Sequence, residues 1–161
     1  MKIIVGMADM QVTNAPGATL ITYALGSCIG VTLYDPMVKV GGLLHFMLPD
    51  SQLDPQKAQR KPWMFADTGI PLFFKEAYRL GGEKERMVVT VTGGSQLMDD
   101  SGYFNIGKRN YLMLRKIFWA NNVLIRSEAI GGNVNRTVRM ELSTGEVWVK
   151  TSGEEEREIC P

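Results

Sequence analysis

The sequence has little of what metal sites need: it contains one histidine, His45, and two cysteines, Cys28 and Cys160. A zinc site takes three or four nitrogen, sulfur or carboxylate ligands, and one histidine with two distant cysteines does not supply a typical set. We therefore expect no metal and no other cofactor. A Cys28–Cys160 disulfide is an alternative use of the two thiols, but disulfides are rare in the cytoplasm, where we expect this protein to lie.

Charge of one sign and long apolar runs are also lacking. The formal net charge is +1, so no basic excess points to nucleic acid as a partner. No apolar run approaches the ~20 residues of a membrane-spanning helix, and the first residues do not resemble a secretory leader. The sequence predicts a cytoplasmic protein that is not embedded in a membrane. Its 161 residues suit a single domain over residues 1–153, followed by a solvated acidic tail over residues 154–161.

Strand patterns dominate the first 50 residues, and helical patterns come later. Strands are expected over residues 3–7, 18–25, 29–34, 40–47, 87–92, 123–130, 137–142 and 146–150. One helix is expected to begin at Asp67 or Thr68, and a second to run from Asn105 to Asn121, while residues 51–62 form an exposed loop. This order predicts an α/β (α+β) layered sandwich with mixed, largely antiparallel sheets and about two main helices.

The first hairpin brings two reactive side chains together. Asp35-Pro36 predicts a turn between strands 29–34 and 40–47, and Pro36 disfavours the two-residue turns that need a positive φ. With a four-residue loop over 35–38, Cys28 lies directly opposite His45. Opposed Cβ atoms in an antiparallel pair are roughly 4.5–5.5 Å apart, so the thiol and the imidazole can interact.

A thiol beside an imidazole can carry out acyl transfer. A protonated histidine lowers the pKa of a neighbouring thiol and can return a proton to a leaving amine. Backbone amides near Gly26 and Ser27 are candidates for stabilising an oxyanion. A glycine pair follows each of two strands, at 93–94 and 131–132, and allows either a tight turn or a close backbone approach. Because a lone cysteine in an apolar strand is usually inert core, the residues alone leave catalysis and packing both open.

Several motifs along the chain, taken together, resemble one known family. They are Leu25-Gly26-Ser27-Cys28, Asp35-Pro36, Val40-Gly41-Gly42, His45-Phe46-Met47-Leu48-Pro49, Phe65-Ala66-Asp67-Thr68-Gly69-Ile70, Gly93-Gly94, Asn105-Ile106-Gly107, Arg109-Asn110, Gly131-Gly132 and Arg136. In this order and spacing they resemble the chemoreceptor glutamine deamidase family, CheD.

The resemblance implies an activity and roles for particular residues. Members of that family hydrolyse selected Gln side chains of bacterial chemoreceptors to Glu with release of ammonia, and the same chemistry extends to Glu methyl esters. It makes Cys28 the nucleophile, His45 the base and acid, and Thr22 the residue that orients His45. Gly93 and Gly94 join Gly26 and Ser27 as candidates for the oxyanion hole or the substrate cleft.

The resemblance also implies partners and a fold. A CheC-type phosphatase is expected as regulator, the receptors as substrate, and the fold as a layered sandwich similar to the catalytic domain of toxin deamidases. Two other readings stay open from the residues. One is a different thiol hydrolase, such as a peptidase, and the other is a non-catalytic adaptor that binds CheC or receptors.

Overall fold

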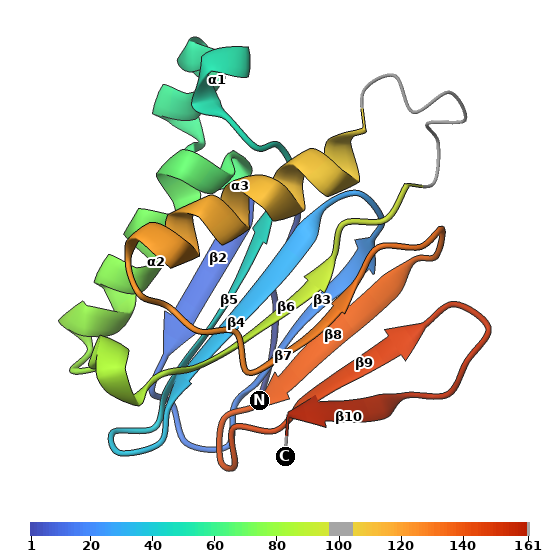
Figure 1. Cartoon of the computed structure of the whole chain (residues 1–161). Helices are drawn as coiled ribbons and strands as arrows, with labels where there is room; N and C mark the ends of the chain where they lie inside the picture. Colours follow the sequence, from blue (N-terminus) through green and yellow to red (C-terminus); the bar gives the residue numbers. More distant parts are fainter. Residues whose placement is uncertain (97–104, 161) are drawn as a thin grey trace.

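The computed structural model describes residues 1–96 and 105–160, and within them the strands form two sheets (Figure 1). The first sheet has the order β1 (Lys2–Ile4), β3 (Thr19–Leu25), β8 (Arg136–Glu141), β9 (Val147–Thr151) and β10 (Arg157–Cys160). The second has the order β2 (Asp9–Thr13), β5 (Val40–Phe46), β4 (Ile29–Asp35), β6 (Val88–Gly93) and β7 (Ser127–Ile130). Only β1–β3 and β6–β7 pair in parallel among the described strands, so the sheets are mixed and largely antiparallel, as predicted.

The elements stack in three layers. Helices α2 (Ala66–Arg79) and α3 (Ile106–Ala120) cover one face of the second sheet, and the first sheet covers the other face (Figure 1). The α+β sandwich with two main helices is therefore confirmed. No helix among the described residues has both the length and the apolar character needed to cross a membrane.

Strands β4 and β5 are buried on both faces because they lie between these two covering layers. In β4, Ile29, Val31 and Leu33 pack towards the helices, while Tyr34 packs towards the first sheet. This two-sided burial explains why both strands read as nearly continuous apolar runs. It also gives the molecule two apolar layers, one under the helices and one between the sheets.

Residues 51–62 were expected to be a loop, and that expectation is wrong. The helix α1 (Pro55–Arg60) lies here between two short 3₁₀ turns, η1 (Ser51–Leu53) and η2 (Pro62–Met64). Asp54 caps α1 by accepting from the amide of Lys57, and Pro55 occupies the first turn, where its missing N–H costs nothing. The polar sequence marked a capped surface helix rather than an irregular segment.

Helix α2 begins at Ala66, slightly earlier than predicted, and Phe65 is its N-cap residue. Neither proposed cap serves that purpose. Asp67 lies inside the first turn and accepts hydrogen bonds from the amide and hydroxyl of Ser51, and Thr68 donates to the Pro62 carbonyl. Both side chains therefore tie the preceding turns to the helix.

The expected solvated tail over residues 154–161 is also wrong in part. Residues Arg157–Cys160 form β10, which pairs antiparallel with β9, and Cys160 is buried. The acidic residues before it are exposed, but Glu156 accepts two hydrogen bonds from Arg139 of β8, at 2.9 and 2.8 Å. The acidic run thus leads into an edge strand that closes the first sheet.

Candidate active site

The β4–β5 register differs from the prediction by one step on each strand. Asp35 pairs with Val40, so the four-residue loop covers residues 36–39, and His45 pairs with Gly30 instead of Cys28. Lys39 adopts a left-handed φ of 53°, which allows the loop to close one residue later than expected. Each residue of β4 therefore pairs with a residue two positions further along β5 than predicted. Because a shift of two preserves the face of the sheet, Cys28 becomes a diagonal neighbour of His45 on the same face.

His45 lies in the layer between the two sheets and is fully buried. Its Nδ1 atom is 2.7 Å from the hydroxyl oxygen of Thr22, which is also fully buried and belongs to β3 of the opposite sheet. The same hydroxyl donates to the carbonyl of Val5 at 2.7 Å. The two sheets therefore meet through a hydrogen-bond chain from Val5 through Thr22 to His45.

This chain determines which nitrogen of His45 carries the proton. A threonine hydroxyl has one hydrogen, and the Thr22 hydroxyl donates it to Val5, so towards His45 it can only accept. The imidazole must then hold its proton on Nδ1, which leaves Nε2 as the basic nitrogen. Nε2 is buried and makes no hydrogen bond to any described residue. It is therefore available as a base.

Cys28 is partly buried, lies just before β4, and packs against the same inter-sheet layer. Burial raises the pKa of its thiol to about 11, opposed in part by its own backbone amide. Burial lowers the pKa of His45 to about 4. We expected a protonated histidine to lower the thiol pKa, whereas both shifts favour a neutral thiol and a neutral imidazole at rest.

One carboxylate counters the effect of burial on His45. Asp9 of β2 is the register partner of His45 across the β2–β5 pair, so both side chains project from the same face. Its negative charge raises the pKa of His45, although burial has the larger effect and the net shift is downward. Asp9 was not identified from the sequence, because β2 itself was not predicted.

The first glycine pair contacts the backbone of Cys28. A Cβ atom on Gly93 would lie 2.2 Å from the Cys28 carbonyl oxygen, and its φ is +116°. The amide of Gly94 donates to the same carbonyl at 2.9 Å. The amide of Ser95 donates to the carbonyl of Gly26 at 2.8 Å. The sequence allowed either a tight turn or a close backbone approach at Gly93-Gly94, and the structure shows the close backbone approach.

These contacts narrow the choice of oxyanion donors. The Gly94 amide is committed to the Cys28 carbonyl, and Gly93 lies in the β4–β6 ladder opposite Ile29. The amides of Ser27 and Cys28 stand next to the sulfur on an open bend rather than in a ladder. They are the better candidates, and the glycine pair instead supports the loop from which they project.

Arg136 and Ser95 join the two glycine pairs, and sequence reasoning gave neither a role. Arg136 donates through one terminal nitrogen to the Gly93 carbonyl at 3.3 Å and to the Ser95 hydroxyl at 3.2 Å. Ser95 in turn donates to the Gly131 carbonyl at 3.0 Å. Both pairs therefore belong to one hydrogen-bonded loop cluster behind Cys28.

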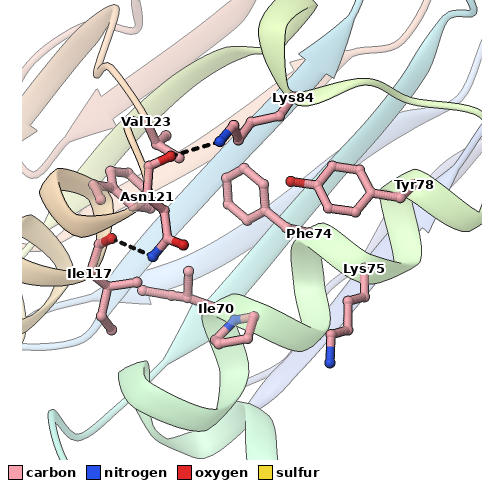
Figure 2. A pocket seen from close by; sticks show the side chains of 10 residues that line it. Ile70, Phe74, Lys75, Tyr78, Lys84, Ile117, Asn121 and Val123 are labelled. Atoms are coloured by element: carbon pink, nitrogen blue, oxygen red, sulfur yellow. Dashed lines mark hydrogen bonds between the residues drawn. The ribbon is translucent and has the colours of Figure 1, made fainter.

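A cavity of about 220 Å³ lies elsewhere, between α2 and α3 (Figure 2). Phe74, Tyr78 and Ile117 line it, and the ammonium group of Lys84 at its edge donates to the Asn121 carbonyl at 2.9 Å. These residues lie on the helix side of the second sheet, whereas Cys28 and His45 face its other side. The cavity is therefore separate from the thiol–imidazole pair.

Both cysteines are free thiols. Cys160 is the buried one, and burial raises the pKa of its thiol as well. Cys160 belongs to β10 at the edge of the first sheet, whereas His45 belongs to β5 of the second. Cys160 therefore provides an internal reference for a thiol outside the site.

The chain is similar to proteins of one family over most of its length. A family model described as CheD chemotactic sensory transduction matches residues 47–151, a range that begins two residues after His45. A protein of Syntrophus aciditrophicus (strain SB) named probable chemoreceptor glutamine deamidase CheD 1 is 58% identical over 157 residues, with 98% of both chains covered. A protein of Solibacter usitatus (strain Ellin6076) named probable chemoreceptor glutamine deamidase CheD is 48% identical over 160 residues, covering 99% of this chain and 94% of that relative.

Proposed function

Because the chain belongs to the CheD family, we propose that it is a chemoreceptor glutamine deamidase, with Cys28 as nucleophile, His45 as base and acid, and Thr22 orienting His45. The observation that carries the proposal is the Val5–Thr22–His45 chain. It leaves Nε2 unprotonated on the face of the sheet where Cys28 packs. A base held in one tautomer beside a thiol is the arrangement that acyl transfer requires.

The first half of the reaction forms a thioester. The Cys28 thiol attacks the side-chain carbonyl carbon of Gln while His45 Nε2 takes the thiol proton, since the resting thiol is neutral. The resulting oxyanion is stabilised by backbone amides, with those of Ser27 and Cys28 nearest the sulfur. When the intermediate collapses, the imidazolium gives its proton to the departing nitrogen and ammonia leaves.

The second half restores the enzyme. A water molecule attacks the thioester carbonyl while the neutral His45 accepts a proton from it. Collapse of this second intermediate breaks the carbon–sulfur bond, leaves Glu on the substrate, and returns the proton to the Cys28 sulfur. Throughout, the Nδ1 proton stays in its hydrogen bond to Thr22. A methyl ester of Glu would follow the same steps with methanol as leaving group.

Replacement of each cysteine tests the proposal. A chemoreceptor cytoplasmic fragment is incubated with the wild-type protein, with Cys28→Ala and with Cys160→Ala, and Gln-to-Glu conversion is located by peptide mass spectrometry. We expect Cys28→Ala to abolish conversion but to keep receptor binding, and Cys160→Ala to retain near-wild-type conversion. Unchanged conversion by Cys28→Ala would eliminate the nucleophile assignment.

The same experiment separates the alternatives. A thiol peptidase would shorten an added control peptide or the receptor chain, with Cys28 required for the cleavage. A non-catalytic adaptor would bind the receptor and leave every Gln unchanged, whichever cysteine is present. Only a deamidase gives an intact chain with acid in place of amide at particular positions.

A CheC-type phosphatase as regulator and a cytoplasmic location belong to the same proposal, and family membership is what supports them. The substrate implies a site of action at the receptor surface rather than within the membrane. Titrating CheC into the receptor assay tests the partner. We expect the conversion rate to change in a saturable way, and a rate that is independent of CheC would remove this partner from the account.

A further inference from the structure

Asn110 of α3 links the segments that carry the two reactive side chains. Its side chain is fully buried, and its amide nitrogen donates to the carbonyls of Ser27 and Met47, each at 2.9 Å. Ser27 directly precedes Cys28, and Met47 lies two residues beyond His45. The two hydrogens of one side-chain amide thus bridge the nucleophile's loop and the end of the strand that holds the base.

The bridge lies where backbone pairing ends. The last register pair of β4 and β5 at this end is Ile29 with Phe46. Beyond it, the amide of Met47 donates to the carbonyl of Met64, so β5 turns away from β4. The Asn110 side chain bridges the two chains one step further, where no register pair of the described strands holds them together.

The position of Asn110 is fixed by the packing of its helix. A Cβ atom on Gly107 would lie 2.3 Å from the Ser95 carbonyl oxygen and 2.6 Å from that of Gly94, so α3 rests directly on the loop behind Cys28. Gly107, Asn110 and Leu114 follow one another at helical spacing on the buried face of α3. Asn110 therefore projects from a surface that is already seated against the site.

We propose that Asn110 is a positioning residue for the reaction: its bridge between Ser27 and Met47 sets the separation of the Cys28 sulfur and the His45 Nε2 atom. This inference depends on the proposed function for its catalytic consequence, although the geometry of the thiol–imidazole pair can be measured independently. Asn110 contacts neither reacting group and acts only through the backbone that carries them.

The test uses two reciprocal substitutions that affect opposite ends of the β4–β5 hairpin, one in α3 and one in β4. Asn110→Asp keeps the shape of the side chain but replaces the donor group with an oxygen that faces two carbonyls. The control is Asp35→Asn at the far end of β4. Asp35 is also fully buried, and it accepts hydrogen bonds from the Glu83 amide at 2.9 Å and from the Arg86 side chain at 3.0 Å.

The two variants should differ in turnover. We expect Asn110→Asp to lower kcat for Gln conversion on the order of 100-fold, the usual cost of a small misplacement, with KM changed less than about threefold. Asp35→Asn should lower the melting temperature and leave kcat within about twofold, since it loosens a distant end. If Asn110→Asp is less stable but equally active, or if Asp35→Asn loses as much kcat, the positioning role is wrong.

Alkylation of the two thiols keeps this test independent of the deamidase activity. We expect the alkylation rate of Cys28 to fall in Asn110→Asp and in His45→Gln alike, with Cys160 unchanged in both. If the two variants show this pattern but the wild-type protein converts no receptor Gln, the proposed function is wrong and the Asn110 bridge is still supported. An unchanged Cys28 rate in Asn110→Asp would defeat the bridge.

A milder variant covers failure of Asn110→Asp to fold. Asn110→Ser keeps one donor and adds no charge, so it retains at most one of the two hydrogen bonds. We expect it to lower kcat and the Cys28 alkylation rate by less than Asn110→Asp but in the same direction. Wild-type values for both quantities in a folded Asn110→Ser protein would overturn the proposal.

Discussion

At the level of single residues, the site depends on the Thr22 hydroxyl, whose single hydrogen allows only one arrangement of its two hydrogen bonds. Thr22 donates to Val5 and therefore accepts from His45, which fixes the tautomer of the imidazole. If Thr22 lost its hydroxyl, Nδ1 would lose its partner inside a buried layer. The ring could then rotate or exchange tautomers, and Nε2 would no longer be held as the base.

Substitution of Thr22 tests this dependence. We expect Thr22→Val, which has nearly the same volume, to lower kcat roughly 10- to 100-fold, up to the low end of the roughly 10²–10⁴-fold that a positioned acid–base group itself contributes. Thr22→Ser keeps the hydroxyl and should retain most of the activity. Steady-state kinetics of the two variants on a receptor fragment measures the difference. Equal activity in both would show that the hydrogen bond to His45 is not needed.

The predicted pairing of Cys28 with His45 was wrong, but their placement on one face of the sheet could be predicted because the error in register was even. A register error of one residue would have placed the two side chains on opposite faces of the sheet. The actual error was two residues, since His45 pairs with Gly30 instead of Cys28, and it preserved the face. Thr22 could not be found in this way. Its contact with His45 depends on how two sheets stack, and no periodicity within one strand specifies that.

At the level of elements, the ends of strands shape the site more than their middles. Gly93 ends β6 with a φ of +116° and lies against the Cys28 carbonyl, where no side chain fits. Gly131 also has a positive φ, of +83°, but a Cβ atom there would meet nothing within 4 Å. A side chain at Gly131 would introduce backbone strain alone, whereas a side chain at Gly93 would introduce both strain and a steric clash.

Alanine at these two positions should have different effects. Gly131→Ala should cost about 1–2 kcal/mol of folding stability, the usual penalty for a left-handed alanine, and should leave turnover nearly unchanged. Gly93→Ala should cost more and should also displace Cys28, lowering kcat on the order of 100-fold. Chemical denaturation and receptor conversion measure the two quantities. A Gly93→Ala variant with normal turnover would mean that this contact does not position the nucleophile.

Elements that escaped prediction are short and supported by tertiary contacts. Strand β2 follows Ala8, whose left-handed φ of 54° separates it from the strand that was expected over residues 3–7. Strand β10 follows an acidic run and is exposed except for its last two residues, so its sequence looks like a tail until β9 provides its partner. The long helices and the buried strands were predictable because their patterns repeat over more residues.

At the level of the whole molecule, the catalytic layer is also a structural layer. The face of the second sheet that holds His45 is covered by a complete sheet, so the imidazole is withdrawn from solvent. The resulting low pKa of His45 is a consequence of the fold and links the reaction chemistry to stability. A layered α+β sandwich was predictable from the order of elements, but the number of layers and the face of the sheet covered by strands were not.

This link predicts how stability depends on pH. The folded pKa of His45 is about 4 and its ordinary value is 6.5, so the unfolded state takes up a proton first as the pH falls. The stability contributed by neutral His45 is complete above pH 6.5 and is lost progressively towards pH 4, by about 3 kcal/mol in all.

Denaturation curves between pH 7 and 4 check this expectation. His45 is the only histidine, so between pH 6.5 and 5 few other side chains change charge. His45→Gln should therefore flatten the curve in that window, whatever its absolute stability. A wild-type curve as flat as that of His45→Gln would mean that the imidazole is more accessible to water than the fold implies.

Trapping the acyl group identifies the thiol that carries out the reaction. A reaction with a chemoreceptor fragment is quenched in acid during turnover, and the protein is digested and mapped by mass spectrometry. We expect a receptor peptide joined through its former Gln side chain to Cys28, and we expect this adduct to be absent from Cys28→Ala. Full conversion of Gln to Glu by Cys28→Ala, or an acyl group found on Cys160 instead, would contradict the assignment of Cys28 as nucleophile.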